Sequence, residues 1–416
     1  MSARVTMLRV GVLYLLAMSS VSAEQQCCPR ESYSSPGFPG TYPSPDGYKG
    51  EVVPPRNVTC KDKDGKRPGC TGTCPNRCPQ QCIVLCPDCK IFCHDAVQPP
   101  KPVPPPAMFV FGDGTLDIGN NGYLPKTQTE GSSPQVSKSS SGRFSNGASL
   151  ADAIATFMGY EMSPPAYMSL HGEVNMLGAN YASAGAGIRN STNGERCIPL
   201  WKQLGYFRAT RAQMEAKLGG EAKLREFLAK SIFLLSVGGQ DLDPRYNAYL
   251  DHPTPQTELQ DLVALYGEAV KSLYDMGARK LAIVNVGLIG CMPRDPLNFY
   301  FCDESLNDRA AAFDAALKPL MAGLASKKPG LFYSIGDLYA YTTAVFANPG
   351  AHGLVNTEEA CSYWSNPEPC NNPDKYWFWE PDSITDQAAM LTGAAFYYVP
   401  QQFTVPITFK ALLEKK

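Results

Sequence analysis

The sequence has little histidine, no strong excess of charge and, after its first residues, no long hydrophobic run. Four histidines occur in 416 residues, so few positions are available for an imidazole base. A net charge of −2 without a long basic run argues against nucleic acid as a partner. No later stretch approaches the roughly 20 apolar residues that a membrane-spanning helix needs, so we expect no transmembrane segment.

Residues 1–23 have the features of a secretory signal peptide. Arg4 and Arg9 precede an apolar run over residues 10–18, and small residues lead up to Ala23. We predict cleavage after Ala23 and a mature protein that is secreted to the extracellular space or the cell wall.

Cysteines and sequons indicate the same compartment. Fifteen cysteines suit an oxidising environment, in which disulfides persist. Asn57 and Asn190 each begin an Asn-x-Ser/Thr sequon and are predicted glycosylation sites in an exported chain.

Residues 24–98 are rich in cysteine, proline and glycine. Prolines interrupt the four-residue spacing of the cysteines, which argues against a continuous helix. We predict a small disulfide-stapled module, because the segment has too few apolar residues for its own core. The pairing of its cysteines stays open. Cys86, Cys89, Cys93 and His94 resemble a zinc site, but an oxidising compartment favours disulfides, and we predict no metal and no cofactor.

A proline-rich linker, residues 99–106, follows the module and favours an extended conformation. Residues 107–416 then alternate apolar runs with amphipathic stretches. Such alternation predicts a three-layer α/β/α domain, in which helices cover both faces of a mainly parallel sheet of about five strands.

The expected strands and helices of this domain follow from the apolar pattern. The strands are expected at residues 108–111, 179–183, 232–237, 281–286 and 331–335. The helices are expected at residues 149–158, 199–218, 258–276, 304–326 and 386–397.

The first expected strand runs into a Gly/Asn-rich turn, Phe109-Val-Phe-Gly-Asp-Gly-Thr-Leu-Asp-Ile-Gly-Asn-Asn121. Active sites of parallel α/β sheets lie at the carboxyl ends of strands, so this junction is the expected position of the chemistry. The stretch resembles the first block of the plant GDSL-type lipases and esterases of the SGNH hydrolase superfamily, F-G-D-S-L-x-D-x-G-N-N. Further blocks are similar to that family: residues 142–147, 180–188, 273–280, 287–293 and 378–379.

The resemblance implies an SGNH-hydrolase fold and ester hydrolysis. That chemistry needs a serine activated by a histidine–aspartate pair, with a glycine N–H and an asparagine amide to stabilise the oxyanion. Every matching position carries another residue in this chain. In the order serine, glycine, asparagine, aspartate and histidine, they are Gly114, Ala184, Gln240, Glu380 and Ser383. A gap would place Asp382 at the aspartate, but no alignment supplies the histidine.

Two residues are candidate substitutes for the missing groups. Thr115 carries the hydroxyl nearest to Gly114, but a shift of one residue in an extended segment predicts that it points to the opposite face. His352 is the first histidine to test as a replacement base. Asp113, Asp117 and the Asn120–Asn121 pair are expected to cap the loop rather than to bind a ligand.

The remaining cysteines and an aromatic cluster receive structural interpretations. Cys291 with Cys302, and Cys361 with Cys370, are expected to form loop-closing disulfides, which leaves Cys197 free or paired with the N-terminal module. The aromatic residues 376–379, with Tyr363 and Trp364, would line an apolar or sugar-binding cleft or form core under the C-terminal helix.

We therefore predict a secreted GDSL lipase/esterase-like protein that has lost ester hydrolysis. It would act by binding a lipid, an acyl ester or a carbohydrate ester of the cell wall. One alternative is an active ester hydrolase with altered machinery, in which Thr115 or Ser383 is the nucleophile and a water or a displaced histidine is the base. A second alternative is a structural wall protein that acts through its Cys-rich module.

Overall fold

A computed structural model describes residues 102–125, 142–243, 255–293, 302–363, 368–399 and 402–416, together with short strands between residues 41 and 94. The chain divides into two units, Met1–Pro100 and Lys101–Lys416. The predicted signal peptide, residues 1–23, lies outside the described residues.

Short antiparallel strands make up the described part of the first unit. They form one sheet in the order β1-β5-β4 and a second from β2 and β3. Their bounds are β1 Thr41–Pro43, β2 Arg56–Thr59, β3 Thr71–Cys74, β4 Gln81–Leu85 and β5 Lys90–His94. The side chain of Asn57, the predicted disulfides of this module and its alternative zinc site lie outside the described residues.

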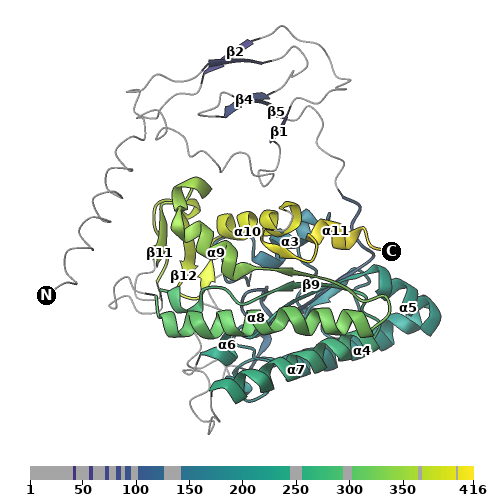
Figure 1. Cartoon of the computed structure of the whole chain (residues 1–416). Coiled ribbons are helices and arrows are strands. Elements are labelled where there is room, and N and C mark those ends of the chain that lie inside the picture. Colours follow the sequence, from purple (N-terminus) through teal and green to yellow (C-terminus); the bar gives the residue numbers. More distant parts are fainter. Residues whose placement is uncertain are drawn as a thin grey trace, which may run out of the picture. The chain divides into compact units, whose positions relative to one another are not determined.

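A six-stranded sheet in the order β14-β10-β9-β8-β6-β7 forms the centre of the second unit (Figure 1). All neighbouring pairs are parallel except β10 and β14. The strands are β6 Met108–Gly112, β7 Gly178–Asn180, β8 Ile232–Ser236, β9 Lys280–Val284, β10 Phe332–Gly336 and β14 Thr404–Val405. The predicted mainly parallel sheet is therefore confirmed, with β14 as an additional antiparallel edge.

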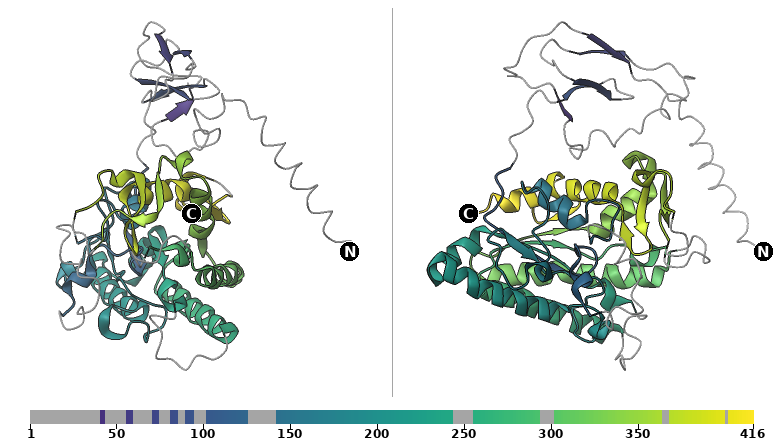
Figure 2. Two further views of the ribbon diagram at one scale, coloured as in Figure 1. Left: turned by 90° about the vertical axis from the view of Figure 1, so that its left-hand side faces the viewer. Right: turned by 180° about the vertical axis from the view of Figure 1, so that it is seen from behind.

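Helices cover both faces of this sheet and complete the three layers (Figures 1 and 2). One face packs against α4 Leu200–Leu218, α5 Glu221–Lys230, α7 Pro255–Asp275 and α8 Glu304–Lys327. The other face packs against α3 Leu150–Phe157, α9 Leu338–Ala347, α10 Asp386–Tyr398 and α11 Phe409–Leu413.

The two faces follow from alternation along each strand. In β6, Phe109 and Phe111 belong to the α4/α7 core, and Met108 and Val110 belong to the α3/α10 core. Every residue of β6 is buried, as expected for a strand that is covered on both sides.

The five predicted strands and five predicted helices are present, with ends shifted by a few residues. At 179–183, β7 ends at Asn180, although Tyr181 N and Ser183 N still donate to the carbonyls of Val110 and Gly112. The sequence interpretation missed α5, α9, α11 and a small sheet of β11 Asn356–Ala360, β12 Tyr376–Glu380 and β13 Ser383–Ile384. The other short elements are α6 Gly239–Leu242, η2 Asn120–Tyr123, η4 Tyr167–Leu170, η5 Gly194–Arg196, η6 Ile289–Cys291, η7 Pro349–His352 and η8 Pro373–Lys375.

Both loop-closing disulfides are confirmed. The sulfur atoms of Cys291 and Cys302 are 1.99 Å apart, and those of Cys361 and Cys370 are 2.02 Å apart. Cys197 is free and buried, and burial raises the pKa of its thiol to about 12, so it is not a reactive thiolate.

No helix within the described ranges is long and apolar enough to span a bilayer.

Candidate functional site

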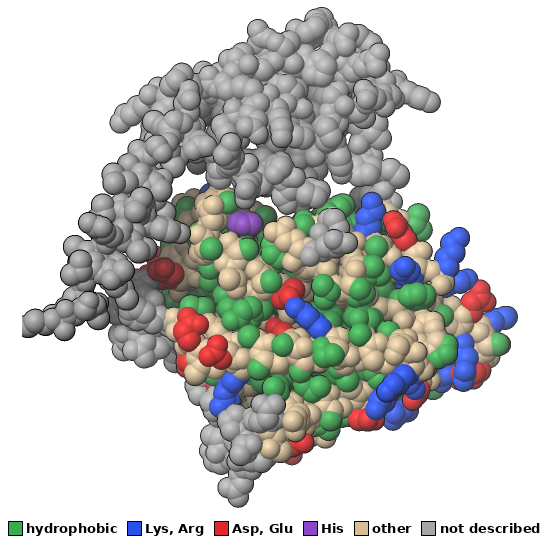
Figure 3. Space-filling view, in the orientation of Figure 1, with side chains coloured by type: hydrophobic (Ala, Val, Ile, Leu, Met, Phe, Trp, Pro, Cys, Tyr) green, Lys and Arg blue, Asp and Glu red, His purple; other side chains and the backbone are tan. Residues whose placement is uncertain are grey.

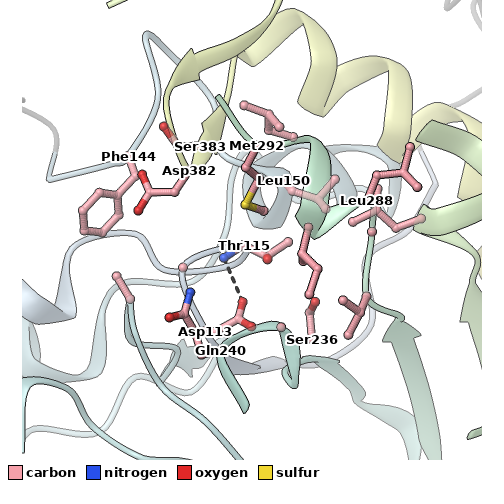
Figure 4. Close-up of a pocket in the computed structure, with 18 of the residues that line it drawn as sticks. Asp113, Thr115, Phe144, Leu150, Ser236, Gln240, Leu288, Met292, Asp382 and Ser383 are labelled. Carbon is pink, nitrogen blue, oxygen red and sulfur yellow. Dashed lines mark hydrogen bonds between the residues drawn. The ribbon is translucent and has the colours of Figure 1, made fainter. Parts of the chain in front are cut away.

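A cavity of about 150 Å³ opens at the carboxyl ends of the central strands. Its lining comes from the loops after β6, β7, β8 and β9 and from the β12–β13 segment. The structure brings together all five positions that match the family's catalytic residues: Gly114, Ala184, Gln240, Glu380 and Ser383. In Figure 4, Asp382 and Ser383 lie across the cavity from Asp113 and Gln240.

Gly112 lets the chain turn from β6 into this cavity. Its φ is +142°, and a Cβ at this position would collide with the Ser236 carbonyl at the end of β8. The Gly112 N–H donates to Gln203 Oε1 at 2.8 Å, and Asp113 N donates to the same Ser236 carbonyl at 3.0 Å. Only glycine fits at this junction.

Asp117 ties the loop after β6 to the loop after β7. Its Oδ1 accepts from Gly119 N at 2.8 Å and Asn120 N at 2.9 Å, and its Oδ2 accepts from Ala184 N at 2.9 Å. Burial raises the pKa of Asp117 to about 6, against the lowering effect of these N–H groups.

The two asparagines strengthen the same connection. Asn120 Nδ2 donates at 2.8 Å to the carbonyls of both Asn180 and Ala182. Asn121 Nδ2 donates to the Ala184 carbonyl at 2.8 Å. The expectation that these polar side chains cap the loop is confirmed.

Gly114 lines the cavity at the position that matches the family's serine. Its φ is not left-handed, and a Cβ built there would be 3.6 Å from the Cα and Cβ of Ala184, an ordinary contact. A serine would therefore fit sterically.

The expectation that Thr115 points to the opposite face is wrong. The segment is a turn and not extended, since the N–H groups of Leu116 and Asp117 both donate to the Asp113 carbonyl, and strand alternation does not apply. Thr115 lines the same cavity as Gly114, and its N–H donates to Asp113 Oδ1 at 3.0 Å (Figure 4). Burial raises the pKa of Asp113 to about 6.

The two positions that match the oxyanion donors both make hydrogen bonds within the protein, but only at Ala184 is the bonded group the donor itself. Ala184 N–H, which would face a substrate oxygen in an oxyanion hole, donates to Asp117 instead. Gln240 Oε1 accepts from Asn193 Nδ2 at 3.2 Å.

Asp241 is a supporting residue to which the sequence interpretation gave no role. It is buried, and it accepts from Ile188 N at 2.7 Å, Arg189 N at 3.0 Å and Thr192 Oγ1 at 2.7 Å. Its place directly after Gln240 in the motif was the available signal. Asp241 holds residues 188–192 against α6.

Glu380 and Ser383 come from adjacent strands of the small sheet. Glu380 is buried, and burial followed by the charge of Asp382 raises its pKa to about 7. Ser383 Oγ is buried and has no hydrogen-bond partner within the described residues. Asp382 lies at the exposed rim of the cavity.

Apolar side chains form much of the remaining cavity wall. Trp377 and Phe378 line it while also belonging to the α3/α10 core, so the aromatic cluster has both of the roles considered for it. Leu150, Leu288 and Met292 complete this wall (Figure 4). Sequence reasoning missed these three, because single apolar residues in a core carry no site signal.

Among the described residues no histidine lines the cavity. His352 is half-buried in η7, 6.0 Å from the Tyr341 ring centroid, and burial lowers its pKa. His171 is exposed, with a φ of +48°. The side chains of His94 and His252 lie outside the described residues. The structure therefore does not bring His352 to the site.

Across the described ranges, no cluster of His, Cys, Asp and Glu has an arrangement that would hold a metal ion.

Comparisons with known proteins identify the family. The family model for GDSL-like lipase/acylhydrolase matches residues 108–384. The chain belongs to this family. It is 30% identical over 314 residues to the GDSL esterase/lipase At1g29660 of Arabidopsis thaliana, covering 70% of this chain and 85% of the relative. It is also 30% identical to the GDSL esterase/lipase LTL1 of the same plant, covering 72% and 90%.

A solved lipase from a goat rumen metagenome, Lip_vut3, aligns with 69% of this chain and 93% of its own, with a low identity of 10% and a low TM-score of 0.30. Membership of the GDSL-like family thus rests on the sequence comparisons. The altered cavity residues therefore stand at the catalytic positions of an ester-hydrolase family.

Proposed function

We propose that this GDSL-like protein is secreted, does not hydrolyse esters and acts by binding an acyl or carbohydrate ester in its cavity. The observation that carries the proposal is Gly114. It lines the cavity at the position of the family's serine and supplies no oxygen for attack. Without a nucleophile, most of the rate of such a catalytic unit is lost, whatever the other residues do.

Two further observations support the same conclusion. None of the described histidines lines the cavity, so neither His171 nor His352 is placed there to accept a proton. The Ala184 N–H is donated to Asp117 and not directed at a ligand oxygen. The apolar wall and the neighbouring polar groups still suit a small ester.

One observation favours the alternative of an active hydrolase. Thr115 lines the cavity beside Asp113, so a hydroxyl and a carboxylate lie close together there. In this alternative Thr115 would attack the ester, and Asp113 would take its proton.

Hydrolysis of p-nitrophenyl butyrate by the purified full chain tests the proposal, together with labelling by a fluorophosphonate probe. We expect neither turnover nor labelling. Turnover that Thr115→Ala abolishes would overturn the proposal in favour of the alternative. Turnover that survives both Thr115→Ala and Ser383→Ala would overturn it in favour of another hydroxyl.

Restoring the missing residues provides the positive control. Gly114→Ser is sterically permitted, because a Cβ meets Ala184 at 3.6 Å. We expect weak hydrolysis only when Gly114→Ser is combined with Ser383→His, and none from either single variant. Activity in the double variant would also show that the purified chain is folded around an intact cavity.

A further inference from the structure

The loop between β7 and α4 carries one of the two predicted glycosylation sequons, Asn190-Ser-Thr192. The fold treats the two ends of this sequon differently, since Asn190 is exposed and Thr192 is fully buried. Attachment of an N-glycan needs both residues, because the asparagine amide receives the sugar and the transferring enzyme contacts the hydroxyl two residues later. The folded loop therefore presents only half of the sequon to an enzyme.

Hydrogen bonds and close packing hold the Thr192 hydroxyl inside the protein. Its Oγ1 donates to Asp241 Oδ1 at 2.7 Å. Gly187 packs directly against it, and a Cβ at Gly187 would be 2.6 Å from Thr192 Oγ1. Asp241 also accepts from Ile188 N at 2.7 Å and Arg189 N at 3.0 Å, so one buried carboxylate fixes the loop at both ends of the sequon. Exposure of the hydroxyl would require these bonds to open.

The residues that hold the loop come much later in the chain. Asp241 follows Thr192 by 49 residues, and Glu258, which forms a 3.4 Å ion pair with Arg189, follows that arginine by 69 residues. At typical rates of synthesis, 49 residues take roughly 2 to 10 s. In a chain that is exported during synthesis, the whole sequon is accessible over that interval.

From these contacts, we propose that Asn190 receives an N-linked glycan before the second unit folds, and that the Thr192–Asp241 hydrogen bond then closes the site to the enzyme. In the transfer, Asn190 Nδ2 forms a bond to the anomeric carbon of an oligosaccharide and loses a proton. The bond from that carbon to the diphosphate oxygen of a lipid-linked donor breaks, and the lipid diphosphate leaves. Because Asn190 is exposed, its glycan is compatible with the folded loop.

The inference goes beyond ligand binding in the cavity and shares with the proposed function only the premise that the chain is secreted.

Translation of the full chain with microsomes tests the site. The chain carries Asn57→Gln, so that Asn190 begins its one remaining sequon. We expect a protease-protected product whose mobility changes with endoglycosidase H, and no such change once Asn190→Gln or Thr192→Val is added. Thr192→Ser keeps a hydroxyl and should still be modified. A protected product without a glycan would overturn the inference alone, whereas a product that protease digests would overturn secretion, on which both proposals depend.

The order of glycosylation and folding is tested on folded protein. The same Asn57→Gln chain is produced in the oxidising periplasm of a bacterium that attaches no N-glycans, and it is then given purified oligosaccharyltransferase with its lipid-linked donor. The reduced, unfolded chain is the reference. A folded chain reacts only through its open population, so we expect modification at Asn190 to be at least about tenfold slower than in the reference. Equal rates would overturn closure of the site by folding.

Variants identify the contacts that close the site. Asp241→Ala removes the acceptor of the Thr192 hydroxyl, and the folded variant should be modified at least about threefold faster than its parent. If Asp241→Ala fails to fold, Asn193→Gly replaces it, because this change removes the Nδ2 that donates to the Gly185 carbonyl at 2.7 Å. Parental rates in both loop variants would overturn the role of these contacts.

Asp261→Ala, on an exposed site of α7, is the matched control. It removes one exposed carboxylate from a surface on which Asp and Glu are intermixed with Lys and Arg, as on the described part of the face in Figure 3. Its folded form should be modified as slowly as the parent. Faster modification of Asp261→Ala would show that general destabilisation, and not the loop, controls access to Asn190.

Discussion

Two segments of this protein line the same cavity and correspond to the two ends of the GDSL pattern, yet they differ in how they are held. The loop after β6 keeps every polar side chain that braces it, and Asp117 alone accepts three backbone N–H groups. The β12–β13 segment has a buried hydroxyl, Ser383 Oγ, without a partner in the described part of the chain, and a buried carboxyl, Glu380, whose pKa is raised to about 7.

The difference shows that the hydrogen bonds that hold a loop in place do not depend on the side chains that would carry out catalysis. In the first loop only Gly114 departs from the side chain that the chemistry needs, and the brace around it is intact. In the β12–β13 segment, Ser383 stands at the position of the family's histidine and its hydroxyl makes no hydrogen bond to a described residue. Hydrogen bonds therefore hold the cavity wall near Gly114, whereas the polar residues near Glu380 differ from those of the family's pattern.

The largest expected effect concerns the entrance to the first loop. Gly112→Ala should destabilise the protein by more than about 4 kcal/mol, because its Cβ would collide with the Ser236 carbonyl at a φ of +142°. Gly114→Ala, two residues on, should change the free energy of unfolding by less than about 0.5 kcal/mol, because its Cβ has room. Urea denaturation measures both. Equal effects would show that the shape of the loop does not depend on this junction.

The next largest effect tests the brace itself. Asp117→Ala should cost at least about 3 kcal/mol of stability, since it leaves three backbone N–H groups without their acceptor. Asp117→Asn should lose less, because one acceptor oxygen remains. Asp261→Ala, on an exposed site of α7, is the matched control and should have little effect on thermal unfolding. A small loss for Asp117→Ala would contradict the comparison.

The β12–β13 segment should instead make the stability of the protein depend on pH. The pKa of Glu380 is raised in the folded state from 4.5 to about 7. Its favourable contribution to the free energy of unfolding is therefore fully present below about pH 4.5 and is lost as pH rises to about 7. Glu380→Gln should therefore stabilise the protein by about 2 kcal/mol at pH 8 and by almost nothing at pH 4. Unfolding free energies at both pH values measure this. A stability gain that is the same at both would show that ionisation of Glu380 is not its cause.

The smallest effect compares two serines that line the cavity. Ser383→Ala should be neutral or stabilising by up to about 1 kcal/mol, because it removes a buried hydroxyl without a described partner. Ser149→Ala should be destabilising by about 1 kcal/mol, because Ser149 forms the capping box of α3 with Asp152. Thermal unfolding of the two variants side by side should give opposite signs. A loss of stability for Ser383→Ala would mean that the Ser383 hydroxyl is hydrogen-bonded in the folded protein.

Much of the fold followed from local patterns. Continuous apolar runs predicted the parallel strands, because a strand that is covered on both faces has no polar side, and amphipathic stretches predicted the main helices. The small β11-β12-β13 sheet was missed, since its short strands alternate buried and exposed positions irregularly. The position of Thr115 was mispredicted because a turn, which two N–H bonds to Asp113 define, replaced the extended chain that was assumed.

The sequence by itself determined the family, the two disulfides in the second unit and the identity of the residues that stand at the catalytic positions. These depend on residue type and spacing along the chain. The tertiary structure decided that Thr115 shares the cavity with Gly114, that Ala184 N–H belongs to Asp117 and that the carboxyl groups of Asp113 and Glu380 line one cavity. Such facts depend on which loops meet at the ends of parallel strands, and burial by distant segments then sets the charge and the hydrogen bonding of each group.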